Sequence, residues 1–118
     1  MNTKQKRCLN LREASDLAFS VAENSDVKNS QHGAVAIGKR GNIIATGYNI
    51  TNMKQKKLPF LTYHAEETLI HNIKSNEIHN IKYIVIVRKG ENKTSKPCSR
   101  CTKLLNKRLP NTTIFYSN

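Results

Sequence analysis

The sequence predicts an α/β fold, a three-layer α-β-α sandwich around a mixed sheet, and three observations lead to this prediction. Helical and extended patterns alternate along the chain in the order α-β-β-α-β-α-β. Residues 81–89 (IKYIVIVRK) are nearly continuous in β-branched side chains, which is typical of a central strand covered on both faces. A length of 118 residues suits one domain, so we expect residues 1–118 to fold as a single domain.

The first helix is predicted over residues 10–25, where apolar residues recur at helical spacing. Asn10 can cap its start, and Glu13 stands three residues on, where it can complete a reciprocal capping box. Two short apolar runs follow, residues 33–38 and 42–49, separated by a turn sequence that contains glycine. They predict a β-hairpin apolar enough to be covered on both faces.

The rest of the chain continues the alternation. The pattern predicts, in order, a lysine-rich loop, a helix, the central strand, a polar loop, a short helix and a last strand, over residues 50–62, 64–73, 81–89, 90–97, 98–109 and 112–117. We expect each β-α-β connection to place two parallel strands side by side. The two helices in these connections should then begin at the same edge of the sheet.

The composition limits the partners of this protein. The formal net charge is +12, which favours an anionic partner such as a nucleotide phosphate. A nucleic-acid groove has less support, because no regular pattern of aromatic and basic residues is present, and A/T-rich codons for Lys, Asn and Ile explain part of the charge equally well. No apolar run approaches the ~20 residues of a membrane span, so we expect a cytoplasmic protein without a membrane partner.

Two separate motifs hold the residues with metal-binding chemistry. Residues 64–66 (HAE) begin the second predicted helix, and residues 97–101 (PCSRC) begin the third. If both helices begin at one sheet edge, His64, Cys98 and Cys101 can meet at one point. One imidazole and two thiolates suit tetrahedral Zn²⁺, and three protein ligands leave the fourth position open, as in catalytic zinc sites. The motifs therefore predict one zinc ion per chain.

Glu66 is the predicted catalytic residue. It stands two residues beyond His64, so it can reach a zinc-bound water without ligating the metal. Zinc lowers the pKa of its bound water to ~7, and a carboxylate at this place can take the proton of that water and pass it to a leaving nitrogen. These are the parts of a hydrolytic deamination.

Other interpretations of these residues stay open. The cysteine pair could be a redox site, and Cys8 could close the zinc as a fourth ligand and make it structural. His71 lies two helical turns, ~10 Å, beyond His64 and is too far away to share the ion. His32 and His79 are expected in solvated loops.

In order and spacing, the two motifs resemble the H-x-E and P-C-x-x-C signature of the zinc-dependent cytidine/deoxycytidylate deaminase superfamily. The resemblance covers most of the chain, because residues 32–37 (HGAVAI) and 41–49 (GNIIATGYN) are similar to the first hairpin of that family. It implies a cytidine deaminase-like fold, here a short version that lacks the C-terminal elements of many members. It also implies zinc on His64, Cys98 and Cys101.

The candidates for substrate binding come from the resemblance in one case and from a position beside or inside the two motifs in the others. Asn49 of the GYN segment matches an asparagine that contacts the substrate in several members. Tyr63 and Ala65 flank the metal-binding histidine, and Tyr63 could stack on a base. Arg100, inside the second motif, could meet a substrate phosphate or face the solvent. These four residues are the substrate-binding candidates.

The resemblance implies a zinc-dependent hydrolase that acts on the C–N bond of a cyclic amidine, with zinc-bound hydroxide attacking C4 of a cytosine-type nucleoside or nucleotide and Glu66 as proton shuttle. The basic charge favours CMP or dCMP, small molecules of nucleotide metabolism. Two alternatives stay open: a deaminase that edits tRNA or single-stranded DNA or RNA, and a non-catalytic interaction module stabilised by zinc. An exposed last strand predicts a homo-oligomer.

Overall fold

The computed structural model describes residues 10–27, 30–51, 62–89 and 97–117. All the predicted helices and strands are present, whereas β3, β4 and the 3₁₀ helix η1 were not predicted. Most of the two predicted loops, at 50–62 and 90–97, falls outside the described residues. In chain order the elements are α1 (Leu11–Ala22), β1 (Gln31–Gly38), β2 (Ile43–Tyr48), β3 (Ile50–Thr51), β4 (Thr62–Tyr63), α2 (Ala65–Asn72), η1 (Ser75–Asn80), β5 (Ile81–Lys89), α3 (Ser99–Arg108) and β6 (Thr113–Tyr116).

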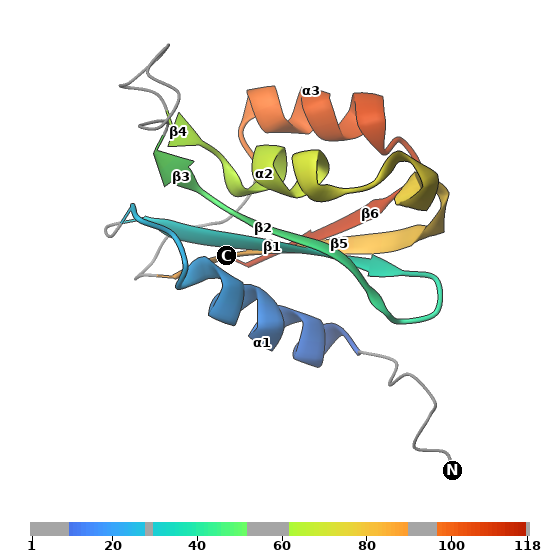
Figure 1. Cartoon of the computed structure of the whole chain (residues 1–118), viewed down its shortest axis with the longest axis horizontal. Helices are drawn as coiled ribbons and strands as arrows, with labels where there is room; N and C mark the ends of the chain where they lie inside the picture. The colour runs from blue at the N-terminus through green and yellow to red at the C-terminus, as the bar shows by residue number, and fades with distance from the viewer. Residues whose placement is uncertain (1–9, 28–29, 52–61, 90–96, 118) are drawn as a thin grey trace.

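The main elements form three layers. A four-stranded sheet of order β2-β1-β5-β6 lies in the middle, with α1 on one face and α2 and α3 on the other (Figure 1). β1 is antiparallel to both β2 and β5, and β6 is parallel to β5. The predicted three-layer sandwich with a mixed sheet is therefore confirmed.

We predicted that the parallel strands of each β-α-β connection would be neighbours in the sheet, and this prediction is wrong for β2 and β5. β1 lies between β2 and β5, because the edge of β1 that the hairpin leaves open pairs along its whole length with β5. Only β5 and β6 are parallel neighbours. β2 and β5 still run in the same direction, since each is antiparallel to β1. The chain segments that follow them therefore leave the sheet at the same edge, as predicted.

The two strands of the hairpin differ in burial. β1 is buried from Gly33 to Gly38, as predicted, whereas β2 alternates between buried and partly exposed residues, and Ile43 is 49% exposed. The prediction that both strands are covered is therefore wrong for β2. Its place at the edge of the sheet is the physical reason, because an edge strand has a neighbour on one side alone.

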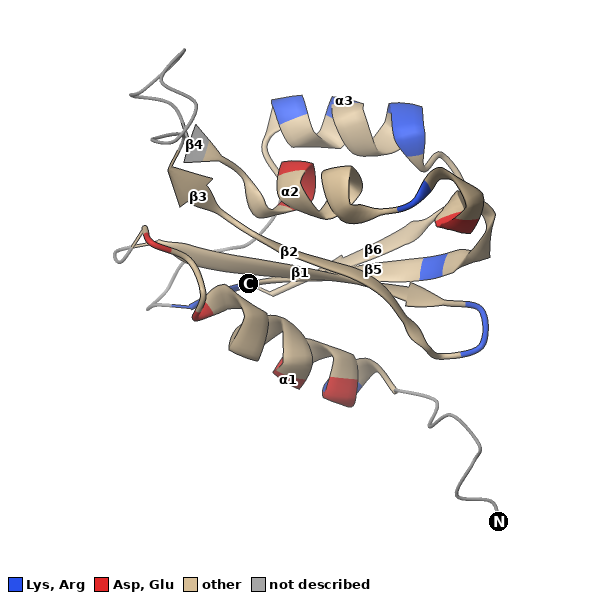
Figure 2. Cartoon of the chain, viewed as in Figure 1, with Lys and Arg blue, Asp and Glu red and all other residues tan. Residues whose placement is uncertain are grey.

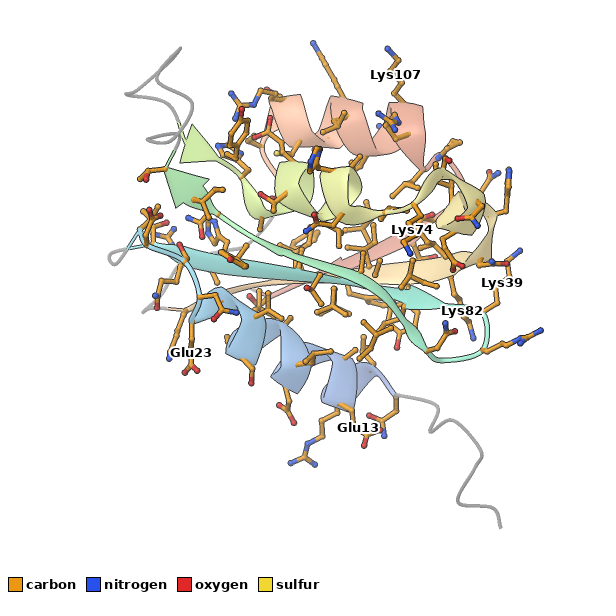
Figure 3. The ribbon with its side chains drawn as sticks, in the orientation of Figure 1. Glu13, Glu23, Lys39, Lys74, Lys82 and Lys107 are labelled. Carbon is orange, nitrogen blue, oxygen red and sulfur yellow. The ribbon has the colours of Figure 1, made fainter. Side chains whose placement is uncertain are left out.

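Side chains of the central strands alternate between two cores, one under each helical layer (Figure 3). On β1 and β5, Ala34 and Ile86 belong to the core under α2 and α3, whereas Val35 and Val85 belong to the core under α1. This is the period of two that a strand imposes on its side chains. No helix in the described part of the chain is both long and apolar enough to cross a membrane.

The predicted start of α1 is confirmed. The Asn10 Oδ1 atom accepts a hydrogen bond from the Glu13 N–H group at 2.8 Å, and the Asn10 N–H group donates to Glu13 Oε1 at 3.2 Å. This reciprocal pair satisfies backbone donors that a helix start leaves without partners.

Gly47 lets α2 approach the sheet closely. A Cβ atom built on Gly47 would lie 2.7 Å from the carbonyl oxygen of Ala65 and closer still to the backbone nitrogen of Leu69. Ala65 is the first residue of α2. The absence of a side chain at Gly47 therefore sets the depth at which α2 and the residue before it, His64, sit against the sheet.

Replacing Gly47 with alanine is expected to lower the free energy of unfolding by about 1–3 kcal/mol, because the added methyl group overpacks the β2–α2 contact. Gly38→Ala is the control, since the added Cβ would mainly meet the side chain of Asn42, which can move. Urea denaturation followed by circular dichroism measures both variants. Equal losses would show that the close β2–α2 approach does not constrain the fold.

Candidate active site

The two motifs occupy the N-caps of two helices. His64 is the N-cap of α2 and Cys98 is the N-cap of α3, and both residues have extended backbone conformations. α2 follows β2 through the short β3–β4 ribbon, and α3 follows β5. Because β2 and β5 point the same way, the starts of α2 and α3 lie at the same edge of the sheet.

This placement brings the three predicted metal ligands together. His64 Nδ1 lies 3.2 Å from Cys101 Sγ and 3.6 Å from Cys98 Sγ. The three ligand atoms all lie within 4.8 Å of one another. Zinc–nitrogen and zinc–sulfur bonds at tetrahedral angles would separate nitrogen from sulfur by about 3.5 Å. The group is therefore positioned to bind one metal ion, and the donor set suits zinc.

The burial of Cys101 also favours a bound cation. Its side chain is fully buried, whereas Cys98 is exposed and His64 is half-buried. Burial, reinforced by the Glu66 carboxylate, raises the pKa of the Cys101 thiol. A thiolate at this place therefore needs a positive charge beside it. A metal ion with two positive charges meets that requirement.

Glu66 is a buried carboxyl group next to this cluster. It is 5% exposed. Burial raises the pKa of Glu66, and the nearby Glu67 carboxylate raises it further, whereas Arg100 opposes the shift. A carboxyl group whose pKa lies above its ordinary value can both accept and release a proton closer to neutral pH.

Arg100 pairs with Glu67, which neither of its two sequence-based interpretations anticipated. Glu67 Oε1 accepts hydrogen bonds from the His64 N–H group at 2.8 Å and from Arg100 Nη2 at 2.9 Å. One carboxylate oxygen therefore links the first turn of α2 to the first turn of α3. Contact between Arg100 and a substrate phosphate stays a prediction.

The other substrate-binding candidates lie around the same edge. The side chain of Asn49 is buried, and it accepts from the His32 N–H group at 2.8 Å and donates to the Ser30 carbonyl oxygen at 2.6 Å. Ala65 is fully buried, and Tyr63 is 36% exposed. Tyr63 borders a hollow of about 550 Å³ whose other lining residues include Tyr48, Ile50, Thr68, His71 and Leu104.

His32 contradicts its sequence-based interpretation as a solvated loop residue. It lies on β1 opposite Arg88 of β5, and its Nε2 atom is buried. Burial, then the positive charges of Arg88 and His64, lower the pKa of His32 to about 4. A strand extended by two residues puts His32 in alternation with the buried Ala34, but the pairing of β1 with β5 is what decides that the strand extends this far.

The predictions for the remaining histidines and for Cys8 stand as follows in the structure. His79 lies exposed on η1, in agreement with its predicted solvation. His71 is not part of the metal-ligand group. Cys8, the candidate fourth ligand, lies outside the described residues.

The Cys101→Ser variant is expected to lose most of the zinc that the purified protein holds, because an alcohol replaces a buried thiolate ligand. Metal content per chain, measured by inductively coupled plasma mass spectrometry, checks this. The His79→Ala variant is the matched control and should keep its zinc, since it removes an exposed histidine. Full zinc occupancy in Cys101→Ser would exclude the proposed ligand group.

In the metal-free protein, Glu66→Gln is expected to raise the melting temperature at pH 7. The folded state raises the pKa of Glu66 above 4.5, so it binds the proton more tightly than the unfolded state does. Stability therefore falls as pH rises above 4.5, and the cost is absent below it. The gap between variant and wild type should therefore open as the pH rises above 4.5. The exposed Asp16→Asn should show no such gap, and a pH-independent gap for Glu66→Gln would contradict the burial argument.

Comparisons with known proteins agree with this geometry. Residues 10–117 match the family model described as the cytidine and deoxycytidylate deaminase zinc-binding region. A search of curated proteins found no match. Among solved structures, a cytidine deaminase from Burkholderia pseudomallei aligns with a TM-score of 0.70 at 17% identity, over 93% of this chain and 86% of that one.

Two further solved structures share the fold. A cytidine deaminase from Mycobacterium leprae aligns with a TM-score of 0.64 at 22% identity, over 90% of this chain and 87% of that one. A dCMP deaminase from the cyanophage S-TIM5, in apo form, aligns with a TM-score of 0.51 at 18% identity, over 86% and 79%. On the match that spans residues 10–117, this chain belongs to the cytidine and deoxycytidylate deaminase zinc-binding family.

Proposed function

We propose that the protein is a zinc-dependent hydrolytic deaminase of a cytosine-type nucleotide, CMP or dCMP. The observation that carries the proposal is the convergence of His64, Cys98 and Cys101 beside the buried carboxyl group of Glu66. A redox role for the two cysteines leaves the histidine and the carboxyl group without a purpose. Membership of the deaminase family supports the same conclusion.

The residues around the cluster would divide the chemistry between them. Zinc, when held by His64, Cys98 and Cys101, supplies a Lewis acid that makes water a nucleophile at neutral pH. Glu66 accepts a proton from the attacking water at its carboxylate oxygen and then donates it to the departing amino nitrogen. Addition of water to C4 and loss of ammonia leave a carbonyl group at that carbon.

Charge supports a phosphorylated substrate. α3 carries four exposed cations and no acidic residue: Arg100, Lys103, Lys107 and Arg108. Figure 2 shows basic residues along α3 and acidic residues at the start of α2 on one side of the sheet, and further acidic residues on α1 on the opposite side. Lys107 points away from the sheet into solvent (Figure 3). A field of this sign attracts an anionic substrate towards this side of the molecule.

The activities of the similar proteins support cytosine as the base of the substrate. Two of the three are cytidine deaminases and one is a dCMP deaminase, so each acts on a cytosine-type substrate. All three are less than 25% identical to this chain, and the fold is what they have in common with it. The identity of the substrate's base as cytosine is therefore part of the proposal.

The homo-oligomer also stays a proposal. β6 is an edge strand, and Phe115 and Tyr116 are each 40% exposed on it. An edge of this kind can pair with a second copy of the chain.

The Glu66→Gln variant is expected to lose turnover by about 10²–10⁴-fold, because the amide cannot shuttle a proton. Its zinc content and circular dichroism spectrum should match those of the wild type. Ammonia release from CMP, dCMP, cytidine and deoxycytidine measures turnover, with Asp16→Asn as a control that keeps activity.

The same assay separates the alternatives when guanine, RNA, tRNA and single-stranded DNA are added to the panel. Ammonia release from nucleic acid alone would replace the proposal with a base-editing deaminase. A zinc-loaded wild type that releases ammonia from no compound of the panel would favour the non-catalytic interaction module.

A further inference from the structure

Arg88 and His32 form a cross-strand pair, and within the described residues one buried side-chain nitrogen of each has no hydrogen-bond partner. They stand opposite each other in the antiparallel register of β1 and β5. Arg88 Nε and His32 Nε2 are buried, and in the described part of the chain neither has a hydrogen-bond partner. Buried polar atoms are nearly always paired, so two adjacent exceptions require a physical reason.

Both side chains lie on the face of the sheet that carries the metal-ligand group. Ala34, two residues after His32, and Ile86, two residues before Arg88, belong to the core under α2 and α3. The alternation of strand side chains puts His32 and Arg88 on that same face. His32 is the second residue of β1 and Arg88 the second-last residue of β5, so the pair lies at the edge of the sheet from which the chain leaves β5 towards α3.

Among the described residues, no counter-ion accompanies the guanidinium group of Arg88. Within residues 10–27, 30–51, 62–89 and 97–117 no carboxylate pairs with it. Glu67 pairs with Arg100, and Glu23 pairs with Lys89. A guanidinium group stays charged at any physiological pH, and a partly buried charge of this kind is costly unless an anion accompanies it.

We propose that Arg88 and His32 bind the phosphate group of the substrate and thereby select a nucleoside monophosphate over the free nucleoside. Arg88 donates its Nε–H group to a phosphate oxygen, and His32, in the tautomer with hydrogen on Nε2, donates to another. Guanidinium and phosphate groups form strong charge-assisted hydrogen bonds. This inference rests on the proposed deaminase function and deepens it by naming the residues that read the phosphate.

Steady-state kinetics on dCMP and deoxycytidine test the assignment. Arg88→Met is expected to lower kcat/KM for dCMP about 10- to 100-fold, and His32→Phe about 10-fold, because charged hydrogen bonds are lost. Both variants should change kcat/KM for deoxycytidine by less than about twofold. Lys89→Met is the matched control, since Lys89 is the adjacent cation on β5 and pairs with Glu23 on the other face. Equal losses on dCMP and deoxycytidine, or no loss on either, would overturn the assignment.

Two further measurements distinguish a loss of phosphate binding from a folding defect. Arg88→Met removes a charge that has no counter-ion among the described residues, so its melting temperature should equal or exceed that of the wild type. Arg88→Lys keeps the charge without the planar fork of donors, and its kcat/KM for dCMP should fall between those of Arg88→Met and the wild type. A lysine variant as poor as the methionine variant, in a protein that melts at a lower temperature, would indicate a structural role instead.

Binding measurements separate this inference from the deaminase proposal. In the zinc-loaded Glu66→Gln background, calorimetric titration should show dCMP binding at least about 10-fold tighter than deoxycytidine, and Arg88→Met should remove that difference. Inorganic phosphate should compete with dCMP in the same background. If the wild type shows no turnover but this binding pattern holds, the deaminase proposal fails and the phosphate site stands. If turnover is present and dCMP binds no tighter than deoxycytidine, the phosphate site fails alone.

Discussion

The antiparallel pairing of β1 with a strand on each of its edges is the constraint on which the site depends. β2 and β5 are parallel to each other because both oppose β1. The chain segments that lead to α2 and α3 therefore leave the sheet at one edge. Without this shared direction, His64 and Cys101, 37 residues apart, would have no common point at which to meet.

The Glu67 carboxylate fixes the relative position of the starts of α2 and α3 more closely than the direction of the strands does. Strand direction brings two helix starts to the same edge, but metal ligation requires atoms within a few ångströms of one another. Glu67 accepts from the backbone of His64 and from the side chain of Arg100, which precedes Cys101. A bridge of this kind fixes one helix start against the other. Arg100 therefore contributes to the site through geometry, whatever contact it makes with substrate.

Several polar side chains near the site are buried in surroundings that disfavour a charged group or a polar atom without a partner. The acidic groups of Glu66 and Cys101 are buried, and Arg88 and His32 each have a buried nitrogen atom with no partner among the described residues. Each arrangement costs stability unless a partner accompanies it. A metal ion beside the thiolates and an anion beside the guanidinium group would offset those costs. Functional sites commonly concentrate such groups, because binding supplies the missing partner.

The sequence by itself determined the three α-helices, the four strands of the main sheet, the three metal-ligand candidates and the carboxyl group beside them. Local signals are enough for these: the capping box at Asn10, the β-branched run of β5, and two motifs of fixed spacing. It also placed both helix starts at one edge, although it put β2 and β5 side by side. Which strand pairs with the free edge of β1 depends on segments that are distant in the chain, and no local sequence pattern shows it.

Only the tertiary structure decided which polar residues join the site. His32 was interpreted as a solvated loop residue from its neighbours in sequence, yet strand pairing places it opposite Arg88, and its Nε2 atom is buried. Arg100 gave no local sign of its partner, because Glu67 lies 33 residues away. Residue type and spacing follow from the chain itself, whereas burial and charge pairing depend on segments that meet only after folding.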